Sequence, residues 1–73
     1  MSNKHEFKSS SSISHIDYDD NAGCMEIKFS SGATHRYEDC PKDHYHAMKN
    51  VESAGKYFHQ NIRGKFENSR IDN

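Results

Sequence analysis

The chain has few of the residues that staple small domains together or carry a protein through a membrane. Only two cysteines and one proline occur among its 73 residues, and 32% of the residues are hydrophobic. No apolar run exceeds two residues, whereas a membrane-spanning helix needs about 20. The N-terminal region also lacks the hydrophobic stretch of a signal peptide. We therefore expect a cytoplasmic protein with no membrane association.

The two cysteines, Cys24 and Cys40, lack the C-x-x-C spacing of a zinc or redox site. We expect both thiols to be reduced and partly buried. A chain of this length forms one domain and buries only about 60% of the surface that its unfolded state exposes. Because self-association would bury more surface, we expect either a monomer or a weak homodimer.

Motifs of common catalytic and cofactor sites are also missing. The sequence has no G-x-S-x-G elbow, no glycine-rich phosphate loop and no His-x3-His pair. His44 and His46 flank a tyrosine in an expected helix, where residues two apart point to nearly opposite sides. We expect a protein that is not an enzyme and that uses neither a cofactor nor a metal. The six histidines predict pH sensitivity below about 6.5.

Charge is distributed unevenly along the chain, although the net charge is only −1. Residues 1–40 contain four basic and seven acidic side chains and so carry −3. Residues 41–66 contain five basic and two acidic side chains and so carry +3, and residues 67–73 carry −1. Such asymmetry is typical of a side that faces a polyanion, and also of two halves that attract each other.

Alternation of apolar and polar residues predicts three strands. The clearest alternation places Met25, Ile27 and Phe29 on one face. The three expected strands are residues 13–18, 24–29 and 33–38. The first two are separated by a turn rich in Asp, Asn and Gly.

A three-residue loop at residues 30–32, with Gly32 left-handed, predicts the register of the second hairpin. In this register Glu26 lies opposite Arg36, a pair of opposite charges on one face of the sheet. His35 and Tyr37 then share the other, apolar face. We expect supporting roles in the fold for these two rings, whereas Arg36 stays a candidate for ligand contact.

Two helices are expected in the second half of the chain, at residues 41–51 and from Ala54 to about Arg63. Pro41 suits the first helical turn because its missing N–H would have no partner there. Asp39 is placed either to cap that turn or to interact favourably with the N-terminal helix dipole. Val51 should be buried at the end of this first helix. Ser53 is the expected N-cap of the second helix, which should bury Phe58.

Together these elements predict an α+β fold: a three-stranded antiparallel sheet followed by two C-terminal helices packed on one face. The domain should comprise residues 10–66. Residues 1–9 and 67–73 show no sustained apolar periodicity, so we expect them to be flexible tails.

Basic and aromatic side chains occur together on the second helix and on the last strand. Rings that stack on bases, combined with cations that meet phosphates, are typical of proteins that bind single-stranded nucleic acid. The candidates for such contacts are Arg36, Lys56, Tyr57, His59 and Arg63. The alternative for each is structural: the rings can belong to the core, and the cations can keep the domain soluble.

Three stretches carry a family resemblance: "SSSISHIDYD", "MEIKFSSGATHRYEDCP" and "HYHAMKNVESAGKYFHQNIRGKF". From Ser10 to Phe66 the chain resembles the KTSC domain, a family named after lysyl-tRNA synthetase, at whose C-terminus some bacterial members occur. Other members are free-standing small proteins of bacteria and phages. The resemblance implies RNA binding, through the association with the synthetase.

The matching motif residues are His35, Tyr37, Ser53, Gly55, Tyr57, Phe58 and Arg63. In the family an aromatic Tyr-x-Tyr pair follows the hairpin glycine, and here histidine replaces the first tyrosine. The first hypothesis is thus a small non-catalytic module that binds RNA or single-stranded nucleic acid. The second is a protein-interaction or phage accessory domain without a nucleic-acid ligand.

Overall fold

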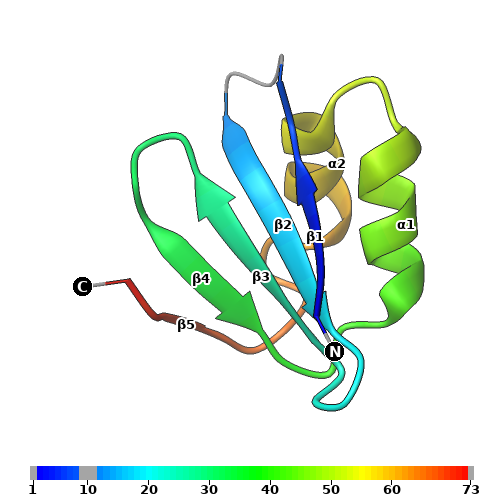
Figure 1. Ribbon diagram of the computed structural model, residues 1–73, viewed down its shortest axis with the longest axis vertical. Helices are drawn as coiled ribbons and strands as arrows, with labels where there is room; N and C mark the ends of the chain where they lie inside the picture. The colour runs from blue at the N-terminus through cyan, green and yellow to red at the C-terminus, as the bar shows by residue number, and fades with distance from the viewer. Residues whose placement is uncertain (1, 9–11, 73) are drawn as a thin grey trace.

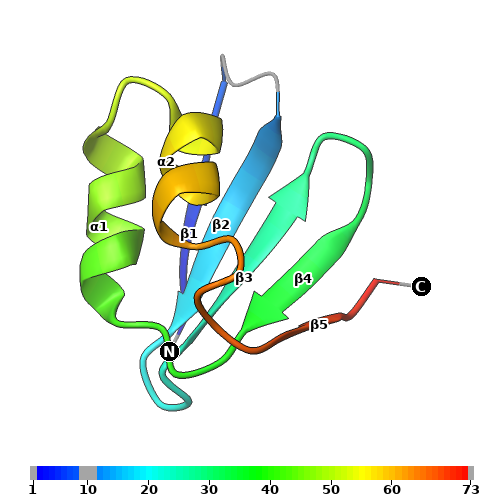
Figure 2. The ribbon, with the colours of Figure 1, turned by 180° about the vertical axis from the view of Figure 1, so that it is seen from behind.

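The computed structural model describes residues 2–8 and 12–72. Its elements are β1 (Ser2–Glu6), β2 (Ile13–Asp19), β3 (Cys24–Phe29), β4 (Thr34–Tyr37), α1 (Lys42–Asn50), α2 (Ala54–Asn61) and β5 (Asn68–Arg70). The strands form one antiparallel sheet in the order β1-β2-β3-β4-β5 (Figure 1). Both helices lie over the same face of this sheet, as Figure 2 shows from the helix side.

The expectation of a three-stranded sheet is wrong, because the sheet has five strands. The two extra strands come from the segments that we expected to be flexible tails: β1 from residues 1–9 and β5 from residues 67–73. Both are edge strands with almost no apolar residues. Their backbones pair with β2 and β4, so hydrogen bonding rather than a hydrophobic pattern holds them in place.

The register of the β3–β4 hairpin is the predicted one. Ile27 pairs with His35, Met25 with Tyr37, and Glu26 with Arg36. Within the loop, Gly32 has a φ of 103°, a value that favours glycine. The sequence therefore predicted correctly which side chains of β4 face the helices.

A bulge in β2 was not predicted. Ile13 pairs with Phe29 and His15 with Lys28, so Ser14 is an extra residue on the β2 side. Because of this extra residue, Ile13 and Ile16 both point into the core and are fully buried.

The helix ends follow the sequence signals in part. The Ser53 side chain caps α2 by accepting a hydrogen bond from the Lys56 backbone N–H at 3.2 Å, as predicted. The expected cap at Asp39 is wrong: α1 has no side-chain cap, and Asp39 lies in the left-handed region with a φ of 51°. The α1 helix ends at Asn50, so Val51 lies beyond it in extended backbone and is exposed rather than buried.

The core fills the space between the sheet and the helices. Its largest fully buried side chains are Ile13, Ile16, Met25, Ile27, Met48 and Ile62. Phe58 on α2 is 6% exposed and meets the rings of Phe29 and Tyr37 edge to face, at centroid distances of 5.2 and 5.7 Å. Both cysteines are free and buried, and burial raises the pKa of Cys40 to about 11.

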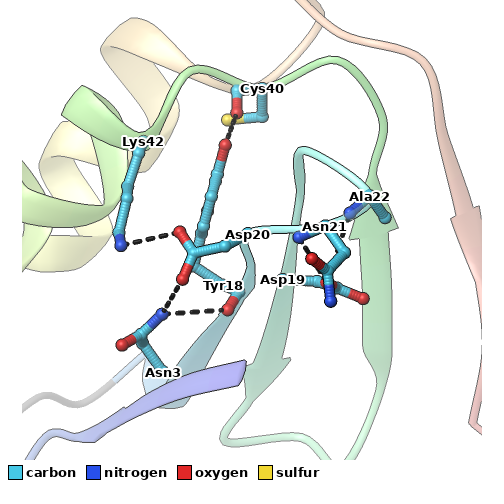
Figure 3. A network of polar contacts seen from close by, with 8 residues as sticks. All are labelled: Asn3, Tyr18, Asp19, Asp20, Asn21, Ala22, Cys40 and Lys42. Atoms are coloured by element: carbon cyan, nitrogen blue, oxygen red, sulfur yellow. Dashed lines mark hydrogen bonds and ion pairs between the residues drawn. The ribbon is translucent and has the colours of Figure 1, made fainter. Parts of the chain in front are cut away.

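A polar network at the β2–β3 turn joins three distant parts of the chain (Figure 3). The Asp20 carboxylate accepts a hydrogen bond from the Asn3 amide of β1 at 2.7 Å and forms an ion pair with Lys42 of α1, also at 2.7 Å. Beside it, the Tyr18 hydroxyl donates to the Cys40 carbonyl at 2.7 Å. These contacts fix the start of α1 and the start of β1 against the same turn.

Replacing Phe58 with alanine is expected to lower the free energy of unfolding by about 3–5 kcal/mol, the usual cost of truncating a buried aromatic side chain. Since a small domain has on the order of 5 kcal/mol of stability, the variant should be largely unfolded. Urea denaturation followed by circular dichroism measures the loss. The exposed neighbour provides the control: His59→Ala should change stability by less than about 0.5 kcal/mol. A loss below about 1 kcal/mol for Phe58→Ala would contradict the packing of α2.

The Asp20 network should make stability depend on pH. Hydrogen bonds from Lys42 and then Asn3 hold the pKa of Asp20 below its ordinary value of 3.8. A lowered pKa in the folded state stabilises the fold above pH 3.8, and this contribution is lost as the pH falls below 3.8 through the folded-state pKa. Asp20→Asn should therefore lower the melting temperature at pH 7 and have progressively less effect in acid.

Melting curves of both proteins between pH 7 and pH 2 test this expectation. Glu67→Gln is the matched control, because this exposed carboxylate forms no ion pair with any residue in the described ranges. If the difference in melting temperature between Asp20→Asn and the parent protein stays constant across the pH range, the Asp20 charge does not stabilise the fold.

Candidate nucleic-acid interface

Three of the predicted contact residues lie together on the outer face of α2. Lys56, His59 and Arg63 are spaced by three and four residues, which places them on one side of the helix and its C-terminal extension. All three side chains are exposed. An Arg63 guanidinium nitrogen, Nη1, lies 3.3 Å from His59 Nδ1, so these two side chains form a continuous polar surface. We call Lys56, His59 and Arg63 the α2 cationic face.

Within the described residues, no carboxylate lies within 4.0 Å of the charged groups of Lys56 or Arg63. Among residues 2–8 and 12–72, the ion pairs within 4.0 Å involve Lys4, Arg36, Lys42 and Arg70. None of these pairs includes Lys56 or Arg63, nor Lys65 just beyond them. Lys56 and Arg63 are thus available to an external anion, whereas Lys4, Arg36 and Arg70 of the sheet are already paired.

Tyr57 is only half-buried and has a role in the fold. Its hydroxyl lies 2.8 Å from His44 Nδ1, and the His44 ring meets Phe66 at a centroid distance of 5.4 Å. Burial is the main reason that the pKa of Tyr57 is raised, with the nearby Cys40 thiol a smaller cause. The Tyr57 ring therefore joins α2 to α1 on one side, and part of it remains accessible on the other.

That accessible side of Tyr57 borders a groove of about 400 Å³. Its lining residues are Val51, Glu52, Ser53, Lys56, Tyr57 and Gln60. We call this the α2 groove. Lys56 belongs both to the groove and to the α2 cationic face, so the two features adjoin. Sequence reasoning did not identify Gln60 or Val51 as site residues, although Gln60 lies one helical turn after Lys56.

A second hollow, of about 330 Å³, lies on the other side of the connection between α1 and α2. Its lining includes Lys8 and Lys49 but also Glu6 and Glu52. Because these charges balance, this hollow offers a polyanion no net attraction, in contrast to the α2 cationic face.

Arg36 does not join the other candidates. It points away from the helices, on the opposite face of the sheet from α2, and pairs with two carboxylates. Its guanidinium lies 3.9 Å from Glu26 and 3.2 Å from Glu38. The structure thus separates Arg36 from Lys56, His59 and Arg63, and engages its charge within the sheet.

His35 and Tyr37 stand on the helix side of β4. The His35 ring lies 6.0 Å from Phe29 and 6.4 Å from Tyr37, and its Nδ1 is 3.3 Å from the side-chain oxygen of Asn68 in β5. Tyr37 is 4% exposed, and its pKa is raised by burial. Both rings therefore support the fold, as the register predicted.

Two further motif residues position α2. Ser53 caps the helix, and Gly55 lets it approach the start of β2 closely. A β-carbon at Gly55 would lie only 3.1 Å from both Cβ and Oγ of Ser12, tighter than ordinary van der Waals contact. These residues place the α2 cationic face without taking part in it.

Comparison with known proteins identifies the family and the fold of this chain. The pattern of the KTSC domain matches residues 9–66. The chain belongs to the KTSC domain family. A crystal structure of the KTSC domain protein YPO2434 from Yersinia pestis covers 99% of this chain and 100% of its own, with a TM-score of 0.90 and 29% sequence identity. The part of this chain that superimposes on that structure thus extends beyond residues 9–66.

A relative of this chain comes from Stutzerimonas stutzeri (strain A1501) and is described as an uncharacterized protein. It is 39% identical over 51 residues, which cover 70% of this chain and 72% of the relative. The comparisons give no support to an association with lysyl-tRNA synthetase. Within the described ranges, no three His, Cys, Asp or Glu side chains gather closely enough to hold a metal ion. None of the helices in that part of the chain has the length and apolar character to span a membrane.

Tyr57→Phe distinguishes the contribution of the Tyr57 hydroxyl to stability from the contribution of its ring. The variant should lose about 0.5–1.5 kcal/mol of stability, because the hydrogen bond to His44 is removed while the ring stays in place. Chemical denaturation measures the difference. Tyr45→Phe is the control, since the Tyr45 hydroxyl makes no hydrogen bond within residues 2–8 and 12–72. If both variants lose the same free energy of unfolding, the Tyr57–His44 contact does not stabilise the fold.

Proposed function

We propose that this KTSC domain protein is a non-catalytic module that binds RNA through the α2 cationic face. The observation that carries the proposal is the grouping of Lys56, His59 and Arg63 on one exposed face without acidic partners. The net charge of the chain is −1, so attraction to a polyanion must come from this local grouping. The proposal leaves out Arg36, whose charge is paired on the opposite face.

The size of the face limits the affinity that it can provide. Each Lys or Arg that meets a phosphate releases counterions, and the affinity therefore falls as salt is added. With two permanently charged side chains and one histidine, the face makes few phosphate contacts. We expect binding that is measurable at about 50 mM salt and weak at physiological salt.

Lys56→Ala combined with Arg63→Ala tests this function. The double variant should bind single-stranded RNA more weakly, and the slope of log K against log salt should become shallower by about 1.4, since each phosphate contact contributes about 0.7 on single strands. Fluorescence anisotropy with a labelled oligonucleotide measures both quantities. The melting temperature should stay nearly unchanged, because both side chains are exposed.

Lys4→Ala combined with Lys28→Ala is the matched control. It removes the same charge from the other face of the sheet, where Lys4 and Lys28 point away from the helices. Equal weakening by the two double variants would show that only total charge matters. Absence of any binding by the parent protein at about 50 mM salt would refute the proposed function, and recovery of a nuclease-insensitive protein partner would favour the interaction hypothesis.

A further inference from the structure

We infer that the α2 groove holds one unpaired nucleobase of the bound strand, stacked on the exposed side of Tyr57. This inference rests on the proposed function and deepens it: the ligand is single-stranded RNA, recognised by a base as well as by its phosphates. The groove has a volume of about 400 Å³ and is open to solvent beside the α2 cationic face. It is therefore within the usual size range for small-molecule sites, about 300–1,000 Å³.

The position of the groove on α2 favours a nucleotide as occupant. Lys56 lies at the boundary, with Arg63 and His59 on one side of it and Gln60 and Tyr57 on the other. A strand that places its phosphate against Lys56 and Arg63 therefore has its base next to the groove. Cation and ring occur side by side, which is the arrangement used by proteins that bind single strands.

The charge inside the groove decides which part of the nucleotide enters it. Glu52 lines the groove together with Lys56, so the interior carries a carboxylate as well as an ammonium group. Because these two charges balance, the groove offers a phosphate no net attraction, whereas a neutral base needs none. The base therefore occupies the groove, and the phosphate stays outside on the cationic face.

The polar groups of the lining suit the edge of a base. The Gln60 amide offers both a donor and an acceptor, and the Glu52 carboxylate accepts hydrogen bonds. Base edges present the complementary groups, including exocyclic amines that donate to carboxylates. Val51, which is 37% exposed, provides apolar contact at the end of the groove. Such an edge is accessible only when the base is neither paired nor stacked in a duplex.

Removing bases from the ligand tests the inference without altering the protein. We would titrate the protein with a single-stranded RNA of about 12 nucleotides and with an abasic oligonucleotide of equal length and charge. The RNA with bases should bind about tenfold more tightly, because stacking of one base on an aromatic ring supplies roughly that factor. A duplex of the same sequence should bind no more tightly than the abasic strand.

Gln60→Glu provides the second measurement. It places a further negative charge in the groove and should reduce the preference for the RNA with bases over the abasic strand to less than about threefold. Asn21→Asp is the matched control, since it makes the same chemical change in the exposed β2–β3 turn, at the opposite end of the domain from the groove (Figure 1). The control should retain the full preference.

The outcomes distinguish the inference from the proposed function. If the abasic strand binds as tightly as the RNA, and the salt dependence becomes shallower in the Lys56→Ala, Arg63→Ala variant, the proposed function holds and the base site is refuted. If neither strand binds at about 50 mM salt, both are refuted. If Gln60→Glu and Asn21→Asp reduce the preference equally, the base does not enter the α2 groove.

Discussion

The register of the β3–β4 hairpin is the constraint on which the rest of the structure depends. The Phe29 N–H donates to the Ala33 carbonyl at 2.8 Å across the loop, and Gly32 supplies the backbone conformation that closes it. Since side chains alternate along a strand, a slip of one residue would turn Tyr37 toward solvent and Arg36 into the core. The hairpin thus decides both what α2 packs on and which cations remain outside.

Elements with a strong local pattern could be predicted from the sequence, and elements held by backbone pairing could not. The β3 strand alternates strictly, and Ser53 stands where a helix cap is favoured, so both were predicted correctly. The side chains of the two edge strands are polar, like those of flexible tails. Their backbone hydrogen bonds can be made to water as well as to β2 or β4, so the sequence does not show that these segments are strands. The bulge at Ser14 likewise leaves no trace in the pattern, since it depends on the pairing of two strands.

The residues of the candidate site also fall into those that the sequence could identify and those that it could not. The sequence identified the cations of α2 because helical spacing alone brings Lys56, His59 and Arg63 together. It also kept Arg36 as a candidate, although the predicted register already placed that side chain opposite Glu26, on the face of the sheet away from the core. The α2 groove was missed because Val51 was expected to extend the first helix. That helix instead ends at Asn50, and Val51 beyond it lines the groove.

The edge strands have a consequence for how this domain behaves when its ends are lost. A chain cut to residues 9–66 keeps the whole family motif but has neither β1 nor β5. The backbone groups of β2 and β4 that now pair with them would then form two open edges, and open edges recruit strands from other chains. The polar edge strands therefore cover the outer edges of β2 and β4, and loss of either one would leave the neighbouring strand open to pairing with another chain.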